Sequence, residues 1–250
     1  MIEAAVFDMD GTLLDTERFN VGFWCEASEM EGVPITRDEA LHIRSLDSGL
    51  AAEYLEGRHP GFEFHAVREV RRRLMREHVE SEGIEAKPGA MEILEVLKRH
   101  GVRTAVATGT AQHRAESYLS EVGLSPYLDL IISASKVEHG KPAPDVYLYA
   151  CERLGSDPGA TVAVEDAPFG VMSALAAGCR VMAVPDLTPL EPSLAARAER
   201  TAGSLEELIP YIEDLLSERC RSDQMIWTIW LIGGLSSVGS VTQRNLKPSS

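Results

Sequence analysis

The chain is poor in positive charge. Its 24 Lys and Arg residues face 39 Asp and Glu residues, which leaves a formal net charge of −15 over 250 residues. Nucleic acids and anionic membranes bind proteins through a basic face, so we expect neither as a partner. An anionic substrate would need local positive charge from a metal ion, a lysine or the N-termini of helices.

Closely spaced cysteines and export signals are also missing. The four cysteines are far apart and form no Cys-x-x-Cys motif, which is typical of a reduced, cytoplasmic protein. No basic segment precedes an apolar stretch at the start of the sequence, so we expect no signal peptide. The apolar run at residues 225–232 is too short to span a bilayer. Together these absences predict a cytoplasmic protein.

One structural unit repeats from about residue 87 onward. Each copy is an amphipathic helix, a glycine that ends it, and a short run rich in β-branched residues, which favours a strand. With the apolar strand at residues 1–8, these units predict an α/β fold, a Rossmann-like doubly wound parallel sheet with helices on both faces. The expected helices span residues 88–100, 112–122, 143–154, 168–177 and 205–216, and the later strands span residues 102–107, 128–133, 161–164 and 180–184.

Residues 16–86 interrupt this pattern, because they show helical spacing and no convincing strand. We expect a catalytic core formed by residues 1–15 and 87–217, with residues 16–86 inserted as a helical cap domain. Residues 218–250 are expected to be a C-terminal extension, whether an extra packed strand, an oligomer contact or an added tail.

An arginine-rich stretch lies inside the insert, at residues 68–76. It could face an anionic substrate. A solvated helix face, on which Glu69 and Glu77 balance the arginines, is the favoured interpretation.

The first apolar strand ends in two carboxylates, Asp8 and Asp10, followed by Gly11. Open α/β sheets bind their ligands at the carboxyl ends of strands, and a glycine lets the chain turn sharply there. Two neighbouring carboxylates repel each other, so a site that contains them usually holds a metal ion or gives each a different protonation role. The alternative is an ordinary turn, since Asp and Gly both favour turns.

Two further segments carry groups that suit a phosphate. Thr108 and Gly109 end a predicted strand and could offer a hydroxyl and backbone N–H groups to phosphoryl oxygens, or could merely cap a helix. Lys141 is followed by proline, which restricts the backbone there. Its ammonium could offset clustered carboxylates and a phosphate, or it could be a surface lysine.

A second acidic pair, Glu165 and Asp166, ends another predicted strand. With Asp8 these residues would make a three-carboxylate oxygen site. Such a site suits Mg²⁺, which prefers hard oxygen ligands and keeps some water molecules.

In their order along the chain, Asp8-Met-Asp10-Gly11-Thr12, then Thr108, Lys141 and Glu165-Asp166, resemble the four motifs of the haloacid dehalogenase superfamily of phosphotransferases. The resemblance covers about residues 1–217. Within the superfamily the chain looks most like the branch with a helical cap, the β-phosphoglucomutase and sugar-phosphatase group.

The resemblance implies a two-step phosphoryl transfer. Asp8 would attack phosphorus and form an aspartyl-phosphate, while Asp10 would act first as general acid and then as general base. Thr108, Gly109 and Lys141 would bind the phosphoryl oxygens. The implied cofactor is Mg²⁺, and its implied ligands are the Asp8 carboxylate, the Asp10 backbone carbonyl, Asp166 and Glu165.

The cap departs from the mutases of this group. Asn20 stands where those mutases carry a histidine, and Ser48 aligns with an arginine that grips a second phosphate, with Arg44 and Arg58 nearby. Trp24 matches an aromatic residue that faces the substrate, although its helical spacing also suits the cap core. Losing the histidine and the arginine together favours a hydrolase, in which water is the final acceptor.

We therefore expect a Mg²⁺-dependent phosphatase that acts on a small phosphorylated metabolite, with sugar phosphates among the candidates, as a monomer or weak homodimer. A sugar-phosphate mutase is the alternative enzyme. A non-catalytic binding protein is less well supported, because it would have no need for a repulsive carboxylate cluster.

Overall fold

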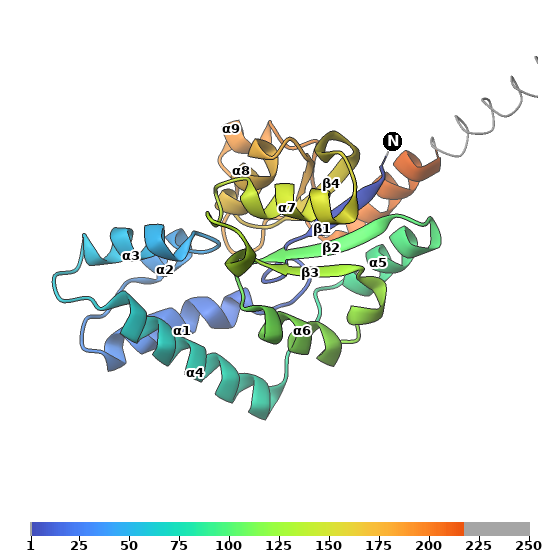
Figure 1. The fold of residues 1–250 in the computed structure, drawn as a ribbon. Coiled ribbons are helices and arrows are strands. Elements are labelled where there is room, and N and C mark those ends of the chain that lie inside the picture. The colour runs from blue at the N-terminus through green and yellow to red at the C-terminus, as the bar shows by residue number, and fades with distance from the viewer. Residues whose placement is uncertain (1, 218–250) are drawn as a thin grey trace, which may run out of the picture.

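A computed structural model describes residues 2–217 of the chain (Figure 1). Its centre is a six-stranded parallel sheet with the strand order β3-β2-β1-β4-β5-β6, which confirms the predicted α/β class. The strands are β1 (Ala4–Phe7), β2 (Arg103–Thr108), β3 (Leu130–Ser133), β4 (Thr161–Glu165), β5 (Arg180–Ala183) and β6 (Arg200–Thr201). After β1, the chain adds β2 and β3 on one side of it, and then adds β4, β5 and β6 on the other side. This reversal creates a switch point between β1 and β4, where such sheets bind ligands.

Helices cover both faces of the sheet. Side chains of β1 alternate between the two faces, so that Phe7 packs toward α5 and α6 while Val6 packs toward α7 and α8. The strand is buried on both sides, which explains its uninterrupted apolar sequence. The covering helices are α5 (Ala90–Arg99), α6 (Gln112–Glu121), α7 (Asp145–Leu154), α8 (Pro168–Ala176) and a last helical stretch at residues 205–217.

The predicted glycine stops are confirmed. Gly101, Gly123, Gly155 and Gly178 follow α5, α6, α7 and α8 and have φ values of 67°, 77°, 66° and 83°. Only glycine adopts this left-handed conformation without a steric penalty. Each glycine therefore ends its helix and sends the chain back toward the next strand.

Some short elements were not predicted. The edge strand β6 and the helix α9 (Pro192–Ala195) are too short to leave a periodic pattern in the sequence. Short 3-10 turns η1 (Ser125–Tyr127), η2 (Ala134–Lys136) and η3 (Pro158–Ala160) also lie in the connections. The predicted C-terminal extension at residues 218–250 lies outside the described residues.

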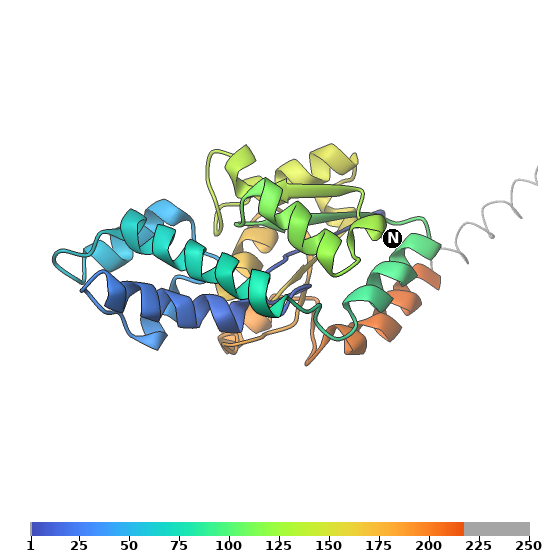
Figure 2. The ribbon, with the colours of Figure 1, turned by 90° about the horizontal axis from the view of Figure 1, so that it is seen from below.

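Four helices between β1 and α5 lie to one side of the sheet (Figures 1 and 2). They are α1 (Glu17–Met30), α2 (Arg37–His42), α3 (Ser48–Glu56) and α4 (Phe64–Glu82), and we call them the cap. The cap has its own apolar cluster, which includes Val21, Leu55, Phe64 and Val67. In the part of the chain that the structure describes, none of the helices is both long and apolar enough to cross a membrane.

The core face of α5 gives a direct test of the packing. Leu94 is 0 % exposed beneath the sheet, whereas Leu148 on α7 is 43 % exposed. We expect Leu94→Ala to lower the free energy of unfolding by about 2–5 kcal/mol, because it removes buried methyl groups and leaves a cavity. Leu148→Ala should change it by about 0.5 kcal/mol or less. Urea unfolding of both variants measures the difference, and equal losses would contradict the assigned packing.

Candidate active site

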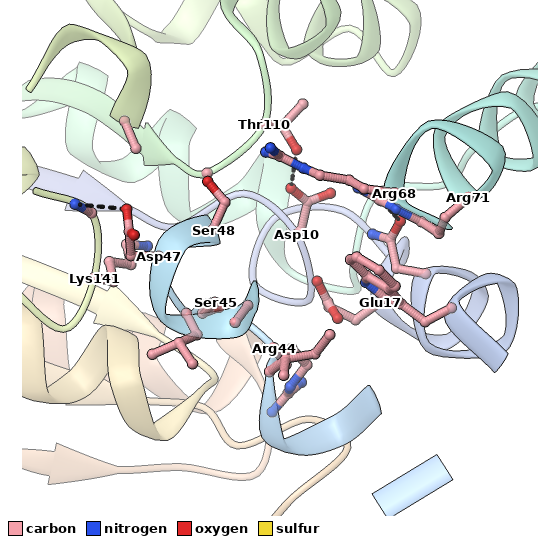
Figure 3. A pocket seen from close by; sticks show the side chains of 18 of the residues that line it. Asp10, Glu17, Arg44, Ser45, Asp47, Ser48, Arg68, Arg71, Thr110 and Lys141 are labelled. Atoms are coloured by element: carbon pink, nitrogen blue, oxygen red, sulfur yellow. Dashed lines mark hydrogen bonds between the residues drawn. The ribbon is translucent and has the colours of Figure 1, made fainter. Parts of the chain in front are cut away.

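Three neighbouring strands deliver the polar motifs to one edge of the sheet. β1 is hydrogen-bonded to β2 on one side and to β4 on the other, so Asp8, Thr108 and Glu165 lie close together at the strand ends. A cavity of about 430 Å³ opens above this edge and is closed on the far side by the cap (Figure 3). Asp8, Asp10 and Lys141 form its floor, and residues of α1 and α4 form much of its roof.

The floor contains a buried carboxylate cluster. One oxygen each of Asp8, Glu165 and Asp166 lies within 4.8 Å of the others. Burial raises the pKa of Asp8 well above its ordinary value, and the nearby acids add to the rise while Lys141 opposes it. Burial likewise raises the pKa of Asp166, with Arg44 opposing the rise. Ionised carboxylates at this position therefore depend on nearby positive charge.

Lys141 supplies part of that charge. Its ammonium contacts Asp8, donates to Glu165 Oε1 at 2.7 Å and to the Ala107 carbonyl at 3.1 Å. Burial alone would lower the lysine pKa, but the Asp8 and Glu165 carboxylates raise it overall. Tyr147 also donates to Glu165 Oε1, at 2.5 Å. Lys141 is thus a fixed, fully charged ammonium beside Asp8.

Asp166 is held from both the core and the cap. Its carboxylate accepts a hydrogen bond from Thr12 Oγ1 at 3.1 Å and forms an ion pair with Arg44 Nη1 at 2.7 Å. Arg44 also donates to Thr188 Oγ1 at 2.9 Å. Gly11 packs against Asp166, and a Cβ at this position would overlap the carboxylate. The turn after β1 therefore requires glycine both for its φ of 91° and for space.

Asp10 points into the cavity on the other side of the turn. Its Oδ1 accepts from Thr16 Oγ1 at 2.6 Å, and its Oδ2 accepts from Thr110 Oγ1 at 2.8 Å and from Thr108 Oγ1 at 3.3 Å. The hydroxyl of Thr108 in turn accepts the backbone N–H of Thr110 at 3.0 Å. Asp8 contacts an ammonium, whereas the side-chain hydrogen bonds of Asp10 among residues 2–217 come from neutral hydroxyls, so the two carboxylates have distinct environments.

The floor has the donor set of a hard-cation site. Asp8 Oδ2 is buried and has no hydrogen-bond partner among the described residues. This oxygen lies beside the carboxylates of Glu165 and Asp166, and carboxylates are the ligands that hard divalent cations prefer. The residues present therefore fit a bound divalent metal ion.

The roof of the cavity carries charged groups of its own. Arg71 on α4 donates to Asn20 Oδ1 at 2.6 Å, and its guanidinium lies 5.4 Å from the centre of the Trp24 ring. Trp24 also stacks on Phe64 at 5.3 Å, so it belongs to the cap core and to the cavity wall at once. Glu17, at the start of α1, faces Asp10. The pKa of Glu17 is raised to about 8, mainly by burial and secondly by the nearby Asp10 carboxylate.

The structure brings the expected site residues together. Asp8, Asp10, Thr108, Lys141, Glu165 and Asp166 meet at the sheet edge, and Gly109 lines the cavity. Ser48 also lines it, as the alignment with the mutases suggested. Arg58 does not, because its guanidinium lies 3.7 Å from the centre of the Tyr54 ring. Glu17 and Thr110 also reach the site, and no sequence motif predicted a role for either.

Glu69 and Glu77 pair with arginines of the stretch at residues 68–76, as the favoured interpretation predicted, Glu69 with Arg72 and Glu77 with Arg73. Part of the stretch also faces the cavity. Arg68, Arg71 and Arg72 line the cavity, whereas Arg73 and Arg76 are exposed. Positions i, i+3 and i+4 of a helix share one face. The spacing of Arg68, Arg71 and Arg72 could therefore have distinguished the arginines that line the cavity from those that are exposed.

The family model of haloacid dehalogenase-like hydrolases matches residues 2–178. The chain belongs to this family. It is 35 % identical over 184 residues to the phosphorylated carbohydrates phosphatase of Thermotoga maritima, covering 71 % of this chain and 82 % of that protein. It is 35 % identical over 182 residues to hexitol phosphatase A of Escherichia coli, covering 72 % and 81 %. The structure resembles that of a putative β-phosphoglucomutase from Thermotoga maritima, with a TM-score of 0.65, 28 % identity and coverage of 85 % and 99 %.

Two helical glycines test how tightly the floor is packed. A Cβ at Gly170 in α8 would overlap the Glu165 carboxylate, whereas a Cβ at Gly22 in α1 would meet nothing within 4 Å. We expect Gly170→Ala to lower the free energy of unfolding by about 1–3 kcal/mol through overpacking. Gly22→Ala should raise it by about 0.5–1 kcal/mol, because alanine favours a helix. Urea unfolding compares the two, and a stabilising Gly170→Ala would contradict the described position of Glu165.

The raised pKa of Glu17 predicts a pH-dependent stability. Glu17 ionises near 4.5 when unfolded and near 8 when folded. Between these values the unfolded chain has released the proton while the folded chain keeps it, so this group makes stability fall as pH rises. The stability of Glu17→Gln relative to the natural chain should therefore grow across this window, by on the order of 1 kcal/mol or more.

Thermal or urea unfolding at pH values from 5 to 8 measures the effect. The control is Glu77→Gln, since Glu77 is on an exposed part of α4. A Glu17→Gln difference that stays constant with pH would contradict the assignment.

Proposed function

We propose that the protein is a Mg²⁺-dependent phosphatase that hydrolyses a small phosphomonoester, with a phosphorylated carbohydrate as the substrate class. The observation that carries the proposal is the pairing of Asp8 with the Lys141 ammonium beneath a cavity into which Asp10 points from the opposite side. Family membership and the phosphatase names of the relatives from Thermotoga maritima and Escherichia coli support the same reaction.

Each carboxylate has a separate task in this reaction. The contact with Lys141 opposes the rise that burial causes in the pKa of Asp8, and so favours the ionised carboxylate that a nucleophile requires. A carboxylate oxygen of Asp8 attacks phosphorus, and the bond to the leaving oxygen breaks as Asp10 gives that oxygen a proton. Asp10, then ionised, takes a proton from the water that attacks the aspartyl-phosphate, and phosphate leaves. Lys141 and Thr108, with the backbone at Gly109, are placed to bind the phosphoryl oxygens.

The metal would be held by Asp8 and Asp166, with the Asp10 backbone carbonyl and Glu165 completing the set. Mg²⁺ at this position would neutralise phosphoryl oxygens that otherwise repel the nucleophile. Glu165 Oε1 already accepts from Lys141 and Tyr147, so its main contribution from the protein side is to hold the lysine in place. Arg44 pairs with Asp166 and lends it positive charge.

The cap favours hydrolysis over the mutase reaction. Asn20, in place of the mutase histidine, is hydrogen-bonded to Arg71 and cannot exchange protons as a histidine does. The buried carboxylates of Asp8, Glu165 and Asp166 repel one another. A non-catalytic binding protein would have no use for such a cluster.

Release of inorganic phosphate from a panel of small phosphomonoesters, with Mg²⁺ and with chelator, tests the proposal. We expect metal-dependent release that Asp8→Asn reduces by about 10³-fold or more, because the amide is not a nucleophile. The control is Asp157→Asn, which changes the same charge at a residue that caps η3. Turnover that survives Asp8→Asn would overturn the mechanism, and turnover unaffected by chelator would overturn the metal requirement.

A further inference from the structure

Two buried cysteines meet on the face of the sheet that α7 and α8 cover. Cys151 lies in α7, and Cys179 immediately precedes β5. Their Sγ atoms are 3.9 Å apart, both thiols are free, and both residues belong to one apolar cluster. A disulfide bond joins sulfur atoms at about 2.05 Å, so the two atoms must approach by roughly 2 Å to bond.

The two thiols differ in acidity. The hydrogen bond with Cys179 lowers the pKa of Cys151 to about 7, against the effect of burial and with help from the Thr161 hydroxyl. The same hydrogen bond, together with burial, raises the pKa of Cys179. Cys151 is therefore the thiolate of the pair, and Cys179 is the thiol that donates to it. A thiolate is the reactive form of cysteine, and a second thiol in contact can complete a disulfide.

One helical turn connects this pair to the active site. Tyr147 and Cys151 occupy positions i and i+4 of α7, which share one face about 6 Å apart along the helix axis. Tyr147 is fully buried and donates to Glu165 Oε1 at 2.5 Å, the oxygen that also accepts from Lys141 at 2.7 Å. A movement of α7 toward Cys179 would therefore reach the lysine through its carboxylate partner.

The core around the two cysteines leaves little room for such a movement to be absorbed. Ala150 on α7, Ala174 on α8 and Val181 on β5 are buried in the same apolar cluster. Protein interiors are close-packed and transmit strain to their neighbours. A covalent bond formed here would therefore displace part of α7 as well as the two side chains.

We propose that Cys151 and Cys179 form a reversible disulfide when hydrogen peroxide oxidises them, and that this disulfide slows turnover by displacing Tyr147 from Glu165. Hydrogen peroxide is small, which suits residues that are only 2 % and 7 % exposed. The effect on turnover rests on the proposed function, whereas formation of the disulfide does not.

The oxidation balances in two steps. The Cys151 thiolate attacks one oxygen of the peroxide, the O–O bond breaks, and the released hydroxide takes a proton from solvent to become water. The sulfur of Cys179 then attacks the resulting sulfenic acid, the S–O bond breaks, and the hydroxyl group leaves with the Cys179 proton as a second water. Dithiothreitol reverses the change by thiol–disulfide exchange, because it becomes a cyclic disulfide and returns a proton to each cysteine.

Mass spectrometry of unreduced peptides from the peroxide-treated full chain tests the site. We expect a peptide pair that joins Cys151 to Cys179, with the loss of two hydrogen atoms, and its disappearance after dithiothreitol. Cys151→Ala and Cys179→Ala should each abolish it. Cys25→Ala is the matched control, because burial raises the pKa of Cys25, and it should leave the linkage intact. Absence of the linkage, or bonding of either cysteine to Cys25 or Cys220 instead, would overturn the site.

Phosphate release from the best substrate of the phosphomonoester panel tests the effect on turnover. We expect oxidation to reduce kcat by about 5-fold or more, since small misplacements of catalytic groups slow a reaction strongly, and dithiothreitol to restore it. Cys151→Ala and Cys179→Ala should keep their rates in peroxide, whereas Cys25→Ala should lose rate as the natural chain does. Dithiothreitol does not reverse methionine oxidation, so recovery separates the two kinds of damage.

Tyr147→Phe tests the route from the disulfide to the site. It keeps the aromatic ring and removes the hydroxyl that bonds Glu165. We expect this variant to start from a lower kcat and then to lose about 2-fold or less on oxidation, because the bond through which the disulfide acts is already gone. A loss on oxidation equal to that of the natural chain would overturn the route through Tyr147.

Peptide mass and phosphate release report separately on the two parts of the proposal. A disulfide that forms without any change in kcat would overturn its effect on turnover. A reduced chain that releases no phosphate from any compound would overturn the proposed function and the effect on turnover with it, while the peptide masses would still decide whether the disulfide forms.

Discussion

The contact of the Lys141 ammonium with Asp8 and Glu165 is the interaction on which the rest of the site depends. Burial excludes water from the floor of the cavity and so favours neutral carboxyl groups, as the raised pKa of Asp8 indicates. A fixed ammonium offsets part of that cost. Glu165 supports this contact, because its Oε1 accepts hydrogen bonds from both Lys141 and Tyr147 and so holds the lysine in position.

The sheet topology makes that contact possible over long sequence distances. Lys141 is 133 residues from Asp8 along the chain. The two meet because β1 lies in the middle of the sheet and Lys141 stands just before α7, which packs against β1 in the same apolar cluster. Such a meeting costs chain entropy, which burial of both faces of β1 helps to offset. The apolar core and the charged floor therefore depend on each other, because packing of the strands fixes the positions of the residues at their carboxyl ends.

The site residues that lie at the ends of strands could be predicted from the sequence. Asp8, Thr108 and Glu165 each end an apolar run, and parallel strands bring such ends to one edge. The ion pair of Arg44 with Asp166 and the approach of Arg114 to α4 could not be predicted in this way. These contacts depend on how the cap is oriented over the sheet, and no local pattern encodes that orientation.

The cavity is electrically divided, with Asp10 at the boundary. Acidic groups concentrate at the floor around Asp8, and a group of arginines lies near Asp10 between α4 and α6, namely Arg68, Arg71, Arg72 and Arg114. A chain of net charge −15 needs local positive charge to attract an anion, and here much of it comes from α4 of the cap. Because the cap lies over the sheet edge, arginines of α4 line the same cavity as Asp8, Asp10 and Lys141. The position of the cap therefore determines which charged groups line the cavity.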